Sequence, residues 1–172
     1  MLVFDCETNG LLHDATEIHC LAIYDTEQDE YFVFNNQGHN CYPITEGLHQ
    51  LNDADVVVGH NVIGFDLPVL NKVYPFFNTK AQIIDTLILS RLFHPNMREI
   101  DDKRNIPRMP LQLYGRHSLE SYGYRLQEYK GDFGKTSDWK EWSQEMQDYC
   151  VQDVKVTTKL CEHFLPYLTG SR

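Results

Sequence analysis

Two acidic residues, Asp5 and Glu7, stand one residue apart at the end of the apolar run Leu2-Val3-Phe4. An apolar run of this kind predicts a buried strand. Side chains on a strand alternate between its two faces, so Asp5 and Glu7 project to one side and Cys6 points into the core. Adjacent carboxylates at the end of a buried strand repel each other and lose hydration, and a bound divalent cation removes both penalties. The pair therefore predicts a metal site.

Other acids occur where such a site would need further ligands. Asp66 follows the apolar run 56–58 and a polar loop, and it opens a stretch with helical periodicity. Tyr149 and Asp153 are four residues apart, so on a helix they share one face. Each has an ordinary structural alternative when taken alone: Asp66 as a helix cap, Tyr149 as part of a core, and Glu7 as the partner of a lysine. Together they indicate one constellation around Asp5.

The order and spacing of these residues resemble the DEDD family of 3′→5′ exonucleases. The sequence is similar to its tyrosine-type branch, because the histidine-type branch has His five residues before the last acid, where this chain has Asp148. Further segments resemble the proofreading domain of family A DNA polymerases, and among these the polymerases of short-tailed bacteriophages. The matching motifs are Asp5-x-Glu7, Asn61-x4-Asp66 and Tyr149-x3-Asp153, and the matching segments are 85–92, 117–126 and 148–154.

The resemblance implies hydrolysis of a terminal phosphodiester with two divalent cations about 3.5–4 Å apart. In this hypothesis Asp5 bridges both cations, while Glu7 and Asp153 complete the site of the one that activates water. Asp66 acts on the second cation through water. Hard oxygen ligands favour Mg²⁺ or Mn²⁺ over zinc. An unperturbed phenol ionises near pH ~10, so Tyr149 is expected to orient the attacking water rather than to act as the base.

The resemblance also implies contacts to the 3′ end of single-stranded DNA. The backbone of Thr8 would hold the terminal nucleotide, and Leu11 would wedge against the last base. Asn61 matches the substrate-contacting asparagine of the second motif. Phe65 could stack on a base. Core packing is the alternative for both Leu11 and Phe65. A preference for single-stranded or frayed ends follows.

Length and composition predict one domain, 1–172, with no polymerase domain after it. The apolar runs are far shorter than the roughly 18 residues of a membrane span, and no secretory leader precedes the first strand. The five cysteines form no C-x-x-C pair, which favours reduced thiols. We therefore expect a cytoplasmic protein without a membrane partner, in the cytoplasm of the host cell if the chain is phage-encoded.

The net charge of −10 argues at first against a nucleic-acid partner, but the charge is unevenly distributed. Residues 1–97 hold three Lys/Arg against thirteen Asp/Glu, whereas residues 98–140 hold nine against seven. The basic segment is either a solvated loop region or a rim that contacts phosphates. In either case we expect weak non-specific affinity for long duplex DNA.

The periodicity predicts an α/β protein with a mixed central sheet flanked by helices. By resemblance this is the ribonuclease H-like fold. We expect Asp85, Ser118 and Ser143 to be helix caps, so Asp85 is structural although it is an acid near the motifs. The predicted strands are 1–7, 18–26, 30–36, 55–59 and 81–84; the helices are 44–52, 66–74, 85–94, 118–123 and 143–165; residues 95–116 are a long loop.

Three functions remain compatible with these residues. The first is a DNA 3′→5′ exonuclease that proofreads for a polymerase domain or subunit. The second is an RNA-processing 3′→5′ exonuclease, because four acids cannot detect a 2′-hydroxyl. The third is a non-catalytic docking module of a polymerase, against which the complete set of four acids and a tyrosine argues.

Overall fold

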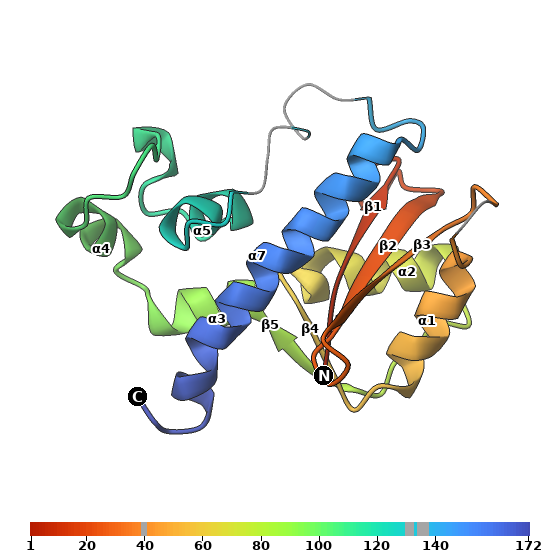
Figure 1. Ribbon diagram of the computed structural model, residues 1–172, viewed down its shortest axis with the longest axis horizontal. Helices are drawn as coiled ribbons and strands as arrows, with labels where there is room; N and C mark the ends of the chain where they lie inside the picture. Colours follow the sequence, from red (N-terminus) through yellow and green to blue (C-terminus); the bar gives the residue numbers. More distant parts are fainter. Residues whose placement is uncertain (39–40, 130–132, 134–137) are drawn as a thin grey trace.

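The computed structural model describes residues 1–38, 41–129, 133 and 138–172. Its centre is a five-stranded mixed sheet with the order β3-β2-β1-β4-β5 (Figure 1). Strands β1, β2 and β3 form an antiparallel meander, while β4 and β5 are parallel to β1. β1 is therefore the central strand. The strands span Leu2–Thr8 (β1), Ile18–Asp25 (β2), Glu30–Asn35 (β3), Val56–Gly59 (β4) and Gln82–Asp85 (β5).

Helices cover both faces of this sheet. Helices α1 (Ile44–Asp53) and α2 (Leu67–Val73) pack on the face that carries Phe4 and Cys6. Helix α7 (Gln144–Leu168) crosses the opposite face, which carries Val3 (Figure 1). The predicted mixed sheet flanked by helices is confirmed, and so is the predicted burial of Cys6.

A second layer of helices packs on the C-terminal half of α7. Figure 1 shows α4 and α5 on the side of α7 away from β1, β2 and β3. Buried side chains of α4, α5 and α7 form a separate apolar cluster there: Met97, Leu119, Tyr122, Val156, Leu160 and Phe164. This layer comprises α3 (Thr86–Phe93), α4 (Met97–Lys103) and α5 (Leu119–Arg125).

The predicted caps are confirmed. The side chains of Asp85, Ser118 and Ser143 each accept a hydrogen bond from a backbone N–H in the first turn of α3, α5 and α7. The start of the predicted helix 66–74 differs, because the chain first forms a π-helical segment, Val62–Asp66, that runs directly into α2.

The predicted loop over 95–116 is wrong, because this segment contains α4 and a 3₁₀ turn, Leu111–Leu113. Tertiary contacts explain the error: α4 buries Met97 in the second layer and Asp101 against Arg125. Two other predicted helices, 118–123 and 143–165, are longer at their C-terminal ends in the structure. α5 continues to Arg125 rather than Gly123, and α7 continues through Pro166 to Leu168.

Among the described residues, no helix is long and apolar enough to cross a membrane.

Candidate metal centre

The acid pair of β1 faces α7. Because Val3, Asp5 and Glu7 alternate with Phe4 and Cys6, the two carboxylates lie on the sheet face that α7 crosses. Ligand atoms of Asp5, Glu7 and Cys150 all lie within 4.8 Å of one another. This spacing suits a metal ion, and the carboxylate oxygens are hard donors.

Cys150 was not among the residues singled out from the sequence. Its thiol donates to the backbone oxygen of Asp5 at 3.3 Å and approaches Asp5 Oδ2 at 3.6 Å. Burial is the main reason that the pKa of this thiol is raised well above its usual range, so the group is a neutral donor. Only the crossing of α7 over β1 shows that Cys150 reaches Asp5.

Asp66 contacts β1 at Cys6, whose side chain lies on the sheet face that α1 and α2 cover. Its Oδ1 accepts hydrogen bonds from the Cys6 N–H and the Cys6 thiol, each at 3.2 Å. The parallel ladder between β1 and β4 contains only Leu2 with Val57 and Val3 with Val58. The amide of Cys6 therefore lies beyond the paired residues of β1 and β4. The Asp66 carboxylate accepts the hydrogen bond that a strand partner would otherwise accept. This bond attaches Asp66 to the residue between Asp5 and Glu7.

The carboxyl of Asp66 is almost fully buried. Burial raises its pKa to about 7, although the hydrogen bonds from Cys6 act in the opposite direction. No lysine or arginine forms an ion pair with Asp66 within the described part of the chain. A buried acid without a protein cation fits a site that an external cation completes.

α7 carries the third motif. Tyr149 is half-buried, with its ring centroid 5.6 Å from that of Phe133 and 6.3 Å from that of Trp139. Asp153 is buried one turn further along the helix. Asp153 lies three residues after Cys150, whose thiol is hydrogen-bonded to Asp5. The crossing of α7 over β1 therefore brings Asp153 toward the acid pair as well. The aromatic pair beside Tyr149 was not foreseen from the sequence.

Asp85 has the structural role predicted for it. Its two oxygens accept hydrogen bonds from the N–H groups of Asn61, Ile63 and Leu87. Asp85 thereby joins the start of α3 to the turn before Asp66. Within that turn Asn61 has a positive φ of 60°. A Cβ on Gly64 would lie 2.6 Å from Asn61 Oδ1, so a larger residue there would require the Asn61 side chain to move.

The four proposed substrate contacts have different environments. Thr8 is buried and donates to the Gly10 oxygen at 2.6 Å, whereas Asn61 is exposed. Leu11 is 75% exposed, so its alternative as a core residue is wrong. Phe65 packs partly against the α1–α2 side of the core, which favours its packing alternative.

The loop that carries Leu11 is held by neighbouring side chains. Asn9 bonds to Thr16 through both its amide nitrogen and its amide oxygen, and Lys72 donates to two carbonyls of the loop from α2. Leu11 is thus an exposed apolar side chain on an ordered loop directly after β1.

The basic segment 98–140 is not a uniform rim. Arg125 is buried in an ion pair with Asp101, and Arg98 pairs with Asp102 on the surface of α4. Lys130 and Lys135 lie outside the described residues. A phosphate-contacting role for the whole segment therefore stays a prediction.

Residues 2–165 match the RNase H superfamily, and this chain belongs to that family. The expected ribonuclease H-like fold is thereby confirmed.

Within the family, the chain is 35% identical to a DNA-directed DNA polymerase of Enterobacteria phage T3 over 188 residues. The match covers 96% of this chain and 26% of the polymerase, so the chain spans about a quarter of that relative's length.

Two solved structures share the fold. A nuclease in its apo form superposes with a TM-score of 0.63 at 22% identity, covering 94% of this chain and 69% of the nuclease. Escherichia coli exonuclease I in complex with a dT13 oligonucleotide superposes with a TM-score of 0.61 at 16% identity, covering 99% of this chain and 42% of that one.

Proposed function

We propose that this chain is a metal-dependent 3′→5′ exonuclease that hydrolyses the terminal phosphodiester of single-stranded or frayed DNA. The observation that carries the proposal is the convergence of α7 and the π-helical segment Val62–Asp66 on β1. Asp5 and Glu7 face α7, which carries Tyr149 and Asp153, while Asp66 is bonded to the residue between the pair. The relatives agree, since one is a DNA polymerase and another is an exonuclease with bound oligonucleotide.

Two divalent cations, Mg²⁺ or Mn²⁺, would supply the activated water and stabilise the leaving 3′ oxygen. Asp5, Glu7 and Asp153 would hold the first, with Asp5 shared between both. Asp66 would act on the second through water, which agrees with the hydrogen bonds that Cys6 already makes to its Oδ1. The phenol of Tyr149 would orient the attacking water, with its ring fixed by neighbouring aromatic rings.

The 3′ end would enter beside Thr8, Leu11 and Asn61. Leu11 is suited to press against the last base, because it is exposed on a loop that Asn9 and Lys72 hold in place. An unpaired end would reach the acids more easily than a base-paired one. We propose proofreading in DNA replication as the role, in connection with a polymerase domain or subunit, because the phage relative is itself a polymerase.

The test is degradation of 5′-labelled single-stranded DNA with Mg²⁺ or Mn²⁺, beside RNA of the same sequence and a blunt duplex. A metal-dependent ladder of shortened 5′-labelled products is expected from the wild type and not from Asp5→Ala. Asp14→Ala removes an exposed acid of the adjacent loop and should keep full activity.

The substrates separate the possible outcomes. Faster degradation of DNA than of RNA supports the DNA enzyme, and the reverse result replaces it with an RNA exonuclease. Absence of cleavage with either metal would contradict the catalytic proposal, and binding to a polymerase would then be measured instead.

A further inference from the structure

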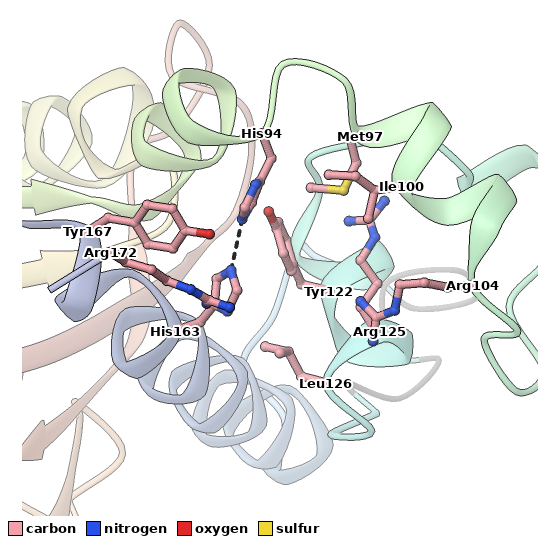
Figure 2. Close-up of a pocket in the computed structure, with 10 residues that line it drawn as sticks. All are labelled: His94, Met97, Ile100, Arg104, Tyr122, Arg125, Leu126, His163, Tyr167 and Arg172. Carbon is pink, nitrogen blue, oxygen red and sulfur yellow. Dashed lines mark hydrogen bonds between the residues drawn. The ribbon is translucent and has the colours of Figure 1, made fainter.

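A basic pocket lies near the C-terminal end of α7, away from the acids (Figure 2). Its volume is about 360 Å³. It lies between the ends of α3 and α7 on one side and α4 and α5 on the other. Five basic side chains line it, and no Asp or Glu is among the ten lining residues. The basic residues are His94, Arg104, Arg125, His163 and Arg172.

Arg125 is fixed in the wall of this pocket. Its Nε and Nη2 donate to the two carboxylate oxygens of Asp101 at 2.9 and 2.7 Å, and the side chains of both residues are almost completely buried. Its third nitrogen, Nη1, is buried and has no hydrogen-bond partner. Buried donors are normally satisfied, so this one points to an acceptor that the chain does not supply.

The other two arginines leave the pocket with net positive charge. Asp101 forms its ion pair with Arg125, and it interacts with Arg104 only at longer range. Arg104 and Arg172 are exposed, and neither forms an ion pair with any residue that the structure describes. Arg172 instead lies over the ring of Tyr167, 5.4 Å from its centroid. In a chain with a net charge of −10, such a concentration of cations around a cavity is unusual.

The two histidines lie next to each other on the α3–α7 side of the pocket. Figure 2 shows His94 and His163 joined by a hydrogen bond, with 2.8 Å between their Nε2 atoms. Burial is the main cause that lowers the pKa of each, and the charge of Arg172 acts in the same direction. An anion in the pocket would offset the repulsion from the arginines and provide an acceptor for imidazole N–H groups.

We propose that this pocket binds a phosphate group, carried by a free nucleotide or by a nucleic-acid strand. Guanidinium groups suit phosphate because they donate two parallel hydrogen bonds to its oxygens. The remaining wall is apolar or aromatic and could pack against the sugar or base: Met97, Ile100, Tyr122, Leu126 and Tyr167. The pocket does not depend on the proposed nuclease function, since none of its residues belongs to the acid site. His163 lies ten residues beyond Asp153, which is about 15 Å along α7.

The experiment is an NMR titration of the whole chain in EDTA, which prevents binding of phosphate at the acids through metal. The imidazole resonances of His94 and His163 report on the pocket. The probes are inorganic phosphate, thymidine monophosphate and an eight-residue oligothymidylate. We expect saturable shifts of both histidines. Equal affinity for the monophosphate and the oligomer identifies a free nucleotide as the ligand, and much tighter binding of the oligomer identifies a strand.

Paired variants decide whether the pocket is responsible. Arg104→Gln with Arg172→Gln should weaken binding about tenfold or more, because each removes a charge-assisted hydrogen bond. Lys103→Gln with Lys155→Gln removes the same charge from exposed positions of α4 and α7 outside the pocket, and it should leave the affinity nearly unchanged. Equal weakening by both pairs, or unshifted histidines with all three probes up to about 10 mM, would overturn the proposal.

Discussion

Asp66 beside β1 and Asp101 in the α4–α5 layer are both buried carboxylates, but their pKa values are shifted in opposite directions. Burial alone would raise the pKa of Asp101, yet hydrogen bonds from Arg125 and the Gly115 N–H outweigh it and lower this pKa. At Asp66 burial prevails, and the pKa rises to about 7. The α4–α5 layer thus contains the cation for its own acid, whereas no lysine or arginine pairs with Asp66 in the described part of the chain.

A structural acid and a functional acid differ in what stabilises their charge. An acid paired inside the protein stabilises the fold, and removing its partner leaves a buried charge. A buried acid whose pKa is raised by burial costs folding free energy when it is charged, and such acids cluster at sites that bind a ligand. Substitutions in the two regions should therefore affect different quantities.

The largest effect is expected from Asp5→Asn. Loss of the shared carboxylate should reduce exonuclease activity by about 10²–10³-fold, the order found when one transition-state-stabilising group is removed. The folded protein should be at least as stable as the wild type, because one of two adjacent like charges disappears. Activity on labelled single-stranded DNA and urea unfolding measure the two quantities. A large loss of stability together with activity would show that Asp5 is structural.

Asp101→Asn should have the reverse profile. Arg125 would keep its charge in a buried position without a carboxylate partner, so the free energy of unfolding should fall by about 3–5 kcal/mol. Specific activity of the folded fraction should stay near that of the wild type. Asp102→Asn is the control, since Asp102 forms an exposed pair with Arg98 that contributes about 0.5 kcal/mol or less. Similar effects of both changes would contradict the buried ion pair.

Asp66 should make the stability of the metal-free protein depend on pH. Its pKa is about 7 in the folded state against 3.8 as the ordinary value, so the folded state binds the proton more tightly. Stability should therefore fall as the pH rises from about 4 to 7, by about 2–4 kcal/mol. Asp66→Asn should remove this part of the pH dependence. Urea unfolding in EDTA from pH 5 to pH 8 tests it, and identical slopes for both proteins would disprove it.

Tyr149→Phe should have a smaller effect than Asp5→Asn. The ring still packs on Phe133 and Trp139, and only the hydroxyl is lost, so a decrease in kcat of about 10–100-fold is expected. Metal affinity should be unchanged. Single-turnover cleavage and a Mn²⁺ titration separate the two, and a loss of metal binding would contradict the role of Tyr149 in orienting water.

Leu11→Ala should give the smallest effect. Leu11 is exposed, so stability should change by less than about 0.5 kcal/mol. Activity at the end of a duplex should fall by roughly threefold or more, because the side chain no longer presses on a base, while cleavage of single strands should change less. An equal decrease on both substrates would argue against the wedge.

Local pattern predicted much of the fold. The alternation around Cys6 placed Asp5 and Glu7 on one face, and the three caps were identified from residue type and position. The same reasoning failed at α4, because only Met97 and Ile100 among its seven residues are apolar, and Pro95 and Pro107 flank it. Its stability comes from the Arg125–Asp101 pair and from Met97 in the second layer, which are contacts between distant parts of the chain.

Sequence pattern alone predicted most of the elements and proposed which acids form the site, because strand and helix periodicity and motif spacing are local properties. The tertiary structure decided which atoms meet. Cys150 contacts Asp5 across 145 positions of sequence. Asp66 accepts a hydrogen bond from the Cys6 amide because the pairing of β1 with β4 ends at Val3. The basic pocket likewise exists only where α7 meets α3, α4 and α5. Such convergence depends on how helices cross the sheet, and the packing of distant side chains sets that crossing.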